Sequence, residues 1–193
     1  MGLSVSVDDR IRALTTALAD TVPGSVVVLR GSRAAGTADE FSDVDVRWQV
    51  GRSGDRALAD LPSALATVGT VESLRLDPDE EPERRLVFVR FAGWSLFERV
   101  DLEVVGAFGD TTPSWVRPWS PAESALMNAI AAVKADRRGG GDVDGLLARG
   151  AARLGAPAPT GSVAERIVAV VDAAVRADPA QQELATRVRA LVT

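Results

Sequence analysis

Apolar residues recur along this chain with two different periods. Up to about residue 118 they form short runs, several of them alternating with polar residues, and two amphipathic helical patterns separate these runs. A mixed β-sheet flanked by helices, an α/β (α+β) fold, is therefore expected for residues 1–118. The expected strands are residues 26–29, 43–50, 70–76, 86–91 and 96–105, and the expected helices are residues 8–20 and 55–68.

From about residue 120 onward the apolar positions follow a helical period. Ser120-Pro121 has the form of a helix N-cap followed by proline at the first helical position, and the run Gly139-Gly140-Gly141 ends that helix. The composition also shifts to Ala, Val, Leu and Arg. Residues 119–193 are therefore expected to form a C-terminal helical bundle. Its later helices are expected at residues 142–154, 162–177 and 180–192.

Local signals add three expectations about the first part of the chain. Asp8 is the expected N-cap of the first helix. The apolar run from Val26 to Leu29 is expected to be a buried strand that leads into a tight turn. Residues 86–91 and 96–105 are expected to pair as a hairpin that turns at Ala92-Gly93.

A small-residue turn and two carboxylates follow the first strand. Gly31-Ser32 would expose backbone N–H groups and one hydroxyl where a phosphate could bind. Asp43 and Asp45 are two residues apart, so on a strand both side chains point the same way. Carboxylates that close repel each other unless a cation lies between them, and their hard oxygen atoms suit Mg²⁺. Taken singly, each feature is more often part of an ordinary turn or a solvent-facing strand than part of a phosphate or metal site.

A third candidate carboxylate lies on the last expected strand. In the stretch from Arg99 to Val105, the apolar residues fall on one face of the strand, while Arg99, Asp101 and Glu103 fall on the other. Either acid could lie near Asp43 and Asp45, or both could simply form the polar side of an edge strand.

The order of these features resembles the signature of the nucleotidyltransferase superfamily, which includes DNA polymerase beta and kanamycin nucleotidyltransferase. That signature is a strand, Gly-Ser, a spacer, Asp-x-Asp and then an aspartate on a later strand, matched here by Gly31-Ser32, Asp43-Val44-Asp45 and Asp101. The segment from Gly31 to Gly36 is most similar to the small stand-alone bacterial members.

The resemblance implies roles for these residues. Asp43, Asp45 and Asp101 would be catalytic and would bind Mg²⁺ or Mn²⁺, two ions being able to clamp the attacking and leaving oxygens. Gly31 and Ser32 would hold the triphosphate of an NTP, with ATP as the expected donor.

Three further residues have roles that the sequence leaves open. Arg33 follows the turn and could approach the phosphates or pair with Asp39 or Glu40. Glu103 could substitute for Asp101 or assist it. Glu123 could be a general base in the acceptor pocket, since a helical bundle shapes that pocket in several relatives, or simply a favourable acid in a helix's first turn.

The expected reaction moves a nucleoside monophosphate, AMP if ATP is the donor, to a hydroxyl or amine of a small molecule or protein and releases pyrophosphate. Two alternatives stay open. Some minimal members of the superfamily are antitoxins that bind or modify a HEPN-type partner, and a degenerate member could bind nucleotide without chemistry. The apolar helical stripes could also support a homodimer.

Composition limits the chemistry and the partners. The chain contains no His, Cys or Tyr, which excludes a Ser-His-Asp or Cys-His nucleophile and any zinc site built from His or Cys. Metal-assisted phosphoryl transfer needs none of these residues. The net charge of −5 argues against a nucleic-acid partner. No apolar run reaches membrane-spanning length, so no membrane partner is expected and a cytoplasmic protein is the default.

Overall fold

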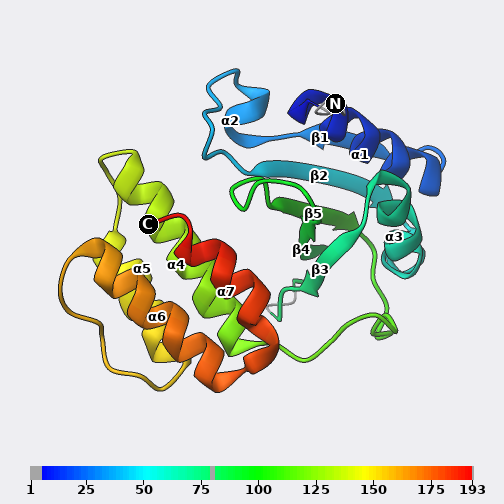
Figure 1. Cartoon of the computed structure of the whole chain (residues 1–193). Helices are drawn as coiled ribbons and strands as arrows, with labels where there is room; N and C mark the ends of the chain where they lie inside the picture. Colours follow the sequence, from blue (N-terminus) through cyan, green and yellow to red (C-terminus); the bar gives the residue numbers. More distant parts are fainter. Residues whose placement is uncertain (1–5, 79–80, 193) are drawn as a thin grey trace. The chain divides into compact units, whose positions relative to one another are not determined.

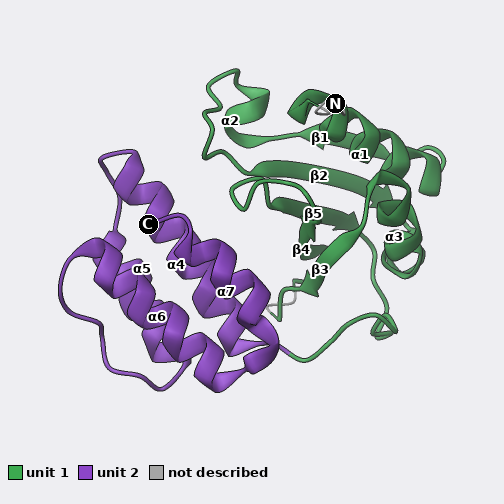
Figure 2. Ribbon diagram, in the orientation of Figure 1, with its two compact units in different colours: residues 1–118 green, residues 119–193 purple. Residues whose placement is uncertain are grey.

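The computed structural model describes residues 6–78 and 81–192. The chain divides into two compact units, residues 1–118 and residues 119–193, which Figure 2 shows in green and purple. The first unit contains the β-sheet and the second is helical.

The first unit is built on a five-stranded mixed sheet with the strand order β1-β2-β5-β4-β3 (Figure 1). β2 and β5 are parallel neighbours in its centre, and the other neighbouring pairs are antiparallel. The expected α+β fold class is confirmed, and the arrangement is consistent with a nucleotidyltransferase-type fold. The strands are β1 (Val26–Leu29), β2 (Val44–Gly51), β3 (Val71–Leu76), β4 (Arg84–Phe91) and β5 (Val100–Gly106), and the helices are α1 (Val7–Thr21), α2 (Gly31–Ala34) and α3 (Gly54–Val68).

The hydrophobic core lies on one face of this sheet, under α1 and α3. Strand alternation sends every second side chain of β2 and β5 into this core, and the buried stripes of the two helices cover them. α3 continues through Pro62 without ending there. The polar residues of β2 and β5 therefore point to the opposite face. The core residues from these elements include Leu14, Leu18, Val44, Val46, Trp48, Leu61, Leu65, Val100, Leu102 and Val104.

Three local expectations for this unit were wrong. The N-cap of α1 is Ser6, whose hydroxyl accepts from the N–H of Asp9, so Asp8 lies inside the helix. β1 is an edge strand rather than a buried one, with Val26 and Val28 exposed. β4 and β5 are antiparallel neighbours as expected, but the segment of residues 92–99 joins them in place of a tight turn. This segment is irregular rather than a strand, and it buries Trp94, Leu96 and Phe97.

The second unit packs its helices through small and aliphatic side chains. α4 begins after Ser120, whose hydroxyl accepts from the N–H of Glu123, and Pro121 is its first residue, as the sequence predicts. α6 begins with a complete capping box between Ser162 and Glu165. The elements are α4 (Pro121–Arg137), α5 (Val143–Arg153), α6 (Val163–Ala177), the 3₁₀ turn η1 (Pro179–Gln181) and α7 (Gln182–Arg189).

Within the described ranges, no helix has both the length and the apolar character that crossing a membrane requires.

Candidate active site

Asp45 and Asp101 lie side by side on the two parallel central strands. The register of β2 and β5 pairs Asp45 with Asp101 directly, and neighbouring strands are about 4.8 Å apart. Both carboxylates point to the face opposite the core, because the flanking residues Val44, Val46, Val100 and Leu102 are buried in it. Two residues more than fifty positions apart in sequence are thus placed next to each other, as the motif predicts.

Asp43 lies one residue before β2, in a loop that Arg33 holds. The Arg33 guanidinium donates from Nε to the carbonyl oxygen of Asp43 (2.9 Å) and from Nη2 to that of Ser42 (2.8 Å). The side chain of Arg33 thus fixes the backbone that carries the first carboxylate of the motif.

The loop before Asp43 is also fixed from its other side. The buried Ser42 hydroxyl donates to Oδ1 of Asp39 (2.8 Å) and accepts from the backbone N–H of Asp39 (3.0 Å). The Phe41 ring packs edge-on against Phe97, with 5.2 Å between the ring centroids. Hydrogen bonds on both sides therefore hold the backbone at Asp43, which limits the positions that its carboxylate can reach.

Gly31 places the turn directly against the Asp45 carboxylate. The N–H of Arg30 donates to the carbonyl oxygen of Asp45 (2.7 Å), which ties the end of β1 to β2. Gly31 then adopts a φ of +63°, a conformation that L side chains rarely take. A Cβ at this position would overlap Oδ2 of Asp45 and lie 3.0 Å from its Cγ. The absence of a side chain at Gly31 is therefore a condition for this position of Asp45.

Ser32 lies in the single helical turn α2, where the sequence predicts a plain turn. The first N–H groups of any helix have no acceptor within it, so those of Gly31, Ser32 and Arg33 are not used by α2 itself. Ser32 is half-buried and its carbonyl oxygen accepts from the N–H of Thr37 (2.9 Å). These donors lie at the residues expected to hold phosphate.

Asp101 is engaged by a guanidinium two residues earlier on the chain. Arg99 donates from Nε to Oδ1 and from Nη2 to Oδ2 of Asp101, both at 2.6 Å. The same guanidinium lies over the ring of Phe88 on β4, with its Cζ 4.6 Å from the centroid. Phe88 is the cross-strand partner of Asp101, so the ion pair and the ring stack come from adjacent positions of the sheet.

Electrostatics favours the charged form of Arg99. Burial opposes its positive charge, but the hydrogen bonds and charge of Asp101 outweigh the burial and raise the pKa of the guanidinium. The charges of Asp43 and Asp45 raise it further. Arg99 is thus a counter-ion to all three carboxylates of the motif, and it was not predicted as a site residue.

The donor set suits a divalent cation, although the three carboxylates are not gathered around one point. Carboxylate oxygens are the ligands that Mg²⁺ and Mn²⁺ prefer, and the close approach of Gly31 leaves Asp45 in a fixed position beside Asp101. In residues 6–78 and 81–192, however, no group of three acidic side chains is close enough to hold a metal ion as it stands. The side chain of Asp101 is directed to Arg99 instead.

Glu103, the second candidate for the third carboxylate, has cationic partners. Its register partner Arg47 donates to Oε2, and Arg84 lies 3.8 Å from Oε1. The hydrogen bond from Arg47 comes first among the causes that lower the pKa of Glu103, followed after opposing burial by the charges of Arg47 and Arg84. Glu103 therefore links β2, β5 and β4 as an ion-pair bridge. Glu123 is buried in the first turn of α4 in the helical unit.

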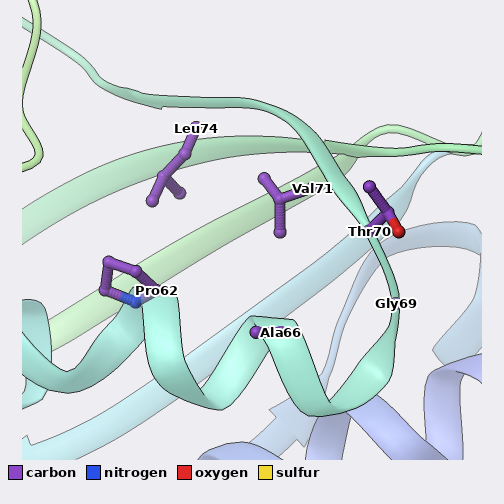
Figure 3. A pocket seen from close by; sticks show the side chains of 6 residues that line it. All are labelled: Pro62, Ala66, Gly69, Thr70, Val71 and Leu74. Carbon is purple, nitrogen blue, oxygen red and sulfur yellow. The ribbon is translucent and has the colours of Figure 1, made fainter.

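A cavity in the first unit lies away from these residues. It has a volume of about 360 Å³ and is formed between α3 and the start of β3, the edge strand farthest from β1 in the sheet (Figure 3). The lining residues carry no charged group and offer a single side-chain hydroxyl, so the cavity is largely apolar. They are Pro62, Ala66, Gly69, Thr70, Val71 and Leu74.

No protein-family model and no curated protein matches this chain. Among solved structures, it is similar to a chain of the GLD-2/RNP-8 complex, with 21% identity over 51% of this chain and 33% of that chain and a TM-score of 0.36. A chain of the GLD-2–GLD-3 poly(A) polymerase complex has 14% identity over 96% of this chain and 63% of that chain, with a TM-score of 0.36. A candidate nucleotidyltransferase from H. pylori has 12% identity over 96% of this chain and 91% of that chain, with a TM-score of 0.29.

The chain spans less than two thirds of the length of the two chains from the GLD-2 complexes. Every TM-score is below 0.5, so these similarities indicate neither a function nor a substrate for this chain.

Proposed function

We propose that this chain is a metal-dependent nucleotidyltransferase that moves a nucleoside monophosphate from an NTP, with ATP as the expected donor, to a hydroxyl or amine. One observation carries the proposal. Asp45 and Asp101 are in register on adjacent parallel strands, and the backbone of Gly31 packs against the Asp45 carboxylate. The turn that we propose to bind phosphate therefore lies close to two acids, on the face of the sheet that the core does not occupy.

Each group of the chain has a task in the proposed reaction. The N–H groups at the start of α2 and the Ser32 hydroxyl donate to phosphate oxygens. Mg²⁺ or Mn²⁺, held by Asp43, Asp45 and Asp101, would supply neutralisation of the phosphate charge. Arg33 keeps the Asp43 backbone in place through its two hydrogen bonds.

The chemical step exchanges one bond to the α-phosphorus for another. The bond from the acceptor oxygen or nitrogen to the α-phosphorus forms, and the bond between that phosphorus and the oxygen leading to the β-phosphorus breaks. Pyrophosphate leaves with the bonding electron pair. The carboxylate of Asp101 orients the acceptor or takes its proton. The chain has no histidine for proton transfer, so a protein base would have to be an Asp, a Glu or a Lys.

One observation favours a second candidate, a protein that binds nucleotide without transferring it. The two oxygens of Asp101 both accept from Arg99, and a carboxylate held in this way is a weak base toward the proton of a substrate. Such a protein would bind an NTP through the α2 turn and Asp45 alone.

Transfer is tested by incubating the chain with each NTP, Mg²⁺ and a set of acceptors that includes an aminoglycoside, a lincosamide and the chain itself. The expected result is a mass gain of one NMP on an acceptor, with an equal amount of pyrophosphate. Asp45→Asn should abolish it. Asp60→Asn, the same change in an exposed ion pair on α3 on the other side of the sheet, should not. Transfer by Asp45→Asn at the wild-type rate would refute the proposal, and NTP binding without transfer to any acceptor would favour the second candidate.

A further inference from the structure

Arg99 holds Asp101 in a bidentate ion pair on this face of the sheet. Two parallel hydrogen bonds of 2.6 Å join the guanidinium to both carboxylate oxygens, which is the bidentate arrangement that fixes direction as well as distance. The side chains of Arg99 and Asp101 are only 27% and 20% exposed. Phe88 supports the guanidinium from a third position. The pair is therefore held by two strands rather than by one flexible side chain.

The guanidinium and a metal ion at Asp101 compete for the same oxygens. A divalent cation on Oδ1 or Oδ2 would lie within a few ångströms of Arg99, and like charges at that distance repel strongly in a half-buried site. Arginine cannot lower the repulsion by losing its proton, because its pKa is too high. In this geometry, Asp101 can thus bind either Arg99 or a metal ion, but not both at once.

Two other arginines on this face pair with Glu103 and not with an acid of the motif. Arg47 and Arg84 neutralise Glu103, which is one position along each strand face from the Asp45–Asp101 pair. Arg99, in contrast, is bonded to a member of the motif and is attracted by the other two acids as well. The acids that would bind a metal therefore already have a positively charged neighbour, the guanidinium of Arg99.

We propose that Arg99 is a built-in counter-ion that takes the place of the cation at Asp101 until metal and nucleotide bind, and that its release from Asp101 completes the metal-binding set. This inference rests on the proposed function. It makes Arg99 a positioning residue that sets the metal concentration at which the site forms.

Metal binding by the full chain, without nucleotide, tests the inference. Free Mn²⁺ is followed by electron paramagnetic resonance during titration of wild type, Arg99→Gln and Arg47→Gln. Arg99→Gln should bind Mn²⁺ about tenfold more tightly than wild type, since no ion pair has to be broken first. Arg47→Gln removes the same charge from the same face of the sheet and should leave the Mn²⁺ affinity within about twofold of wild type.

A second readout and a milder variant keep the test decisive. Without metal, Arg99→Gln should melt below wild type, and Mn²⁺ should raise its Tm more than it raises that of wild type. Arg99→Lys keeps the charge but cannot form two parallel hydrogen bonds, so its Mn²⁺ affinity should lie between the two. This variant provides the comparison if Arg99→Gln does not fold.

The failures of the inference and of the proposed function are distinguishable. Equal or weaker Mn²⁺ binding by the Arg99 variants, with clear binding by wild type, would overturn the counter-ion role and leave the proposed function standing. An equal gain in Arg47→Gln would also overturn it, because general charge would then be the cause. If none of the proteins binds Mn²⁺, even with ATP added, both the inference and the proposed function are wrong.

Discussion

Replacing Gly31 with alanine tests the contact on which the proposed site depends. The substitution adds one methyl group at a φ of +63°, where it overlaps Oδ2 of Asp45. Two effects follow, a strained backbone and a displaced carboxylate. Gly36 separates them, because it has a φ of +69° and nothing within 4 Å of an added Cβ. Gly36→Ala therefore carries the backbone strain alone.

The magnitudes follow from these two effects. A left-handed conformation costs a non-glycine residue about 1–2 kcal/mol, which both variants should show as a loss in the free energy of unfolding. Turning the Asp45 side chain away from its rotamer adds roughly 0.5–1.5 kcal/mol in Gly31→Ala. For a chain of this size, each kcal/mol lowers Tm by about 2–4 °C. The second effect also moves a proposed metal ligand, so binding of Mg²⁺-ATP should weaken about 10- to 100-fold in Gly31→Ala only.

The assay is a thermal melt of both variants followed by calorimetric titration with Mg²⁺-ATP. Gly36→Ala should be destabilised but bind like wild type, whereas Gly31→Ala should be destabilised further and bind weakly. Wild-type binding by Gly31→Ala would show that the position of Asp45 does not matter for the ligand. Equal loss of binding in both variants would show that strain, and not the carboxylate, is responsible.

Two other predictions concern the supports of the site. Arg33→Met removes the hydrogen bonds to the carbonyl oxygens of Ser42 and Asp43. It should cost about 1–3 kcal/mol in the free energy of unfolding by urea and weaken Mg²⁺-ATP binding, with Arg33→Lys intermediate; unchanged ATP affinity would place Asp43 outside the site. The pKa of Glu103 is lowered from its ordinary value of 4.5, first by the hydrogen bond from Arg47. The stability from this ionised carboxylate is present above pH 4.5 and is lost as the pH falls through the lower pKa of the folded state. As the pH falls below 4.5, the Tm of wild type should therefore fall more steeply than the Tm of Glu103→Gln. Parallel pH profiles of the two Tm values would contradict this.

The central part of the site could be predicted because it depends on local rules. Alternation along β2 and β5 is enough to put Asp45 and Asp101 on the polar face, and the order of the motif brings the turn at Gly31 close to them. The direct register between the two acids is a property of strand pairing, so only the structure supplies it.

The partners of the site residues could not be predicted in the same way. The alternating pattern places Arg99 and Asp101 on one face but does not tell which acid the guanidinium will reach, since that depends on the ring of Phe88 from another strand. Arg33 is a similar case, because its acceptors are backbone carbonyls, which leave no sequence signal.

Two errors in the fold have the same origin. A short β-branched run looks alike in an edge strand and a central one, so the exposure of Val26 and Val28 follows only from the strand order. Leu96 and Phe97 extend the apolar pattern before β5, but they are buried in an irregular segment where Phe97 packs against Phe41. Periodicity cannot separate such a segment from a strand.

The most direct test of the central claim is a thermal-shift measurement with ATP, GTP, CTP and UTP, each with and without Mg²⁺. At 100 times its Kd, a nucleotide that binds only the folded chain should stabilise wild type by roughly 2.7 kcal/mol. The account predicts this shift for at least one nucleotide, ATP being expected, only when Mg²⁺ is present, and predicts its loss in Asp45→Asn. Failure of every nucleotide to shift wild-type Tm in the presence of Mg²⁺, or an undiminished shift in Asp45→Asn, would contradict it.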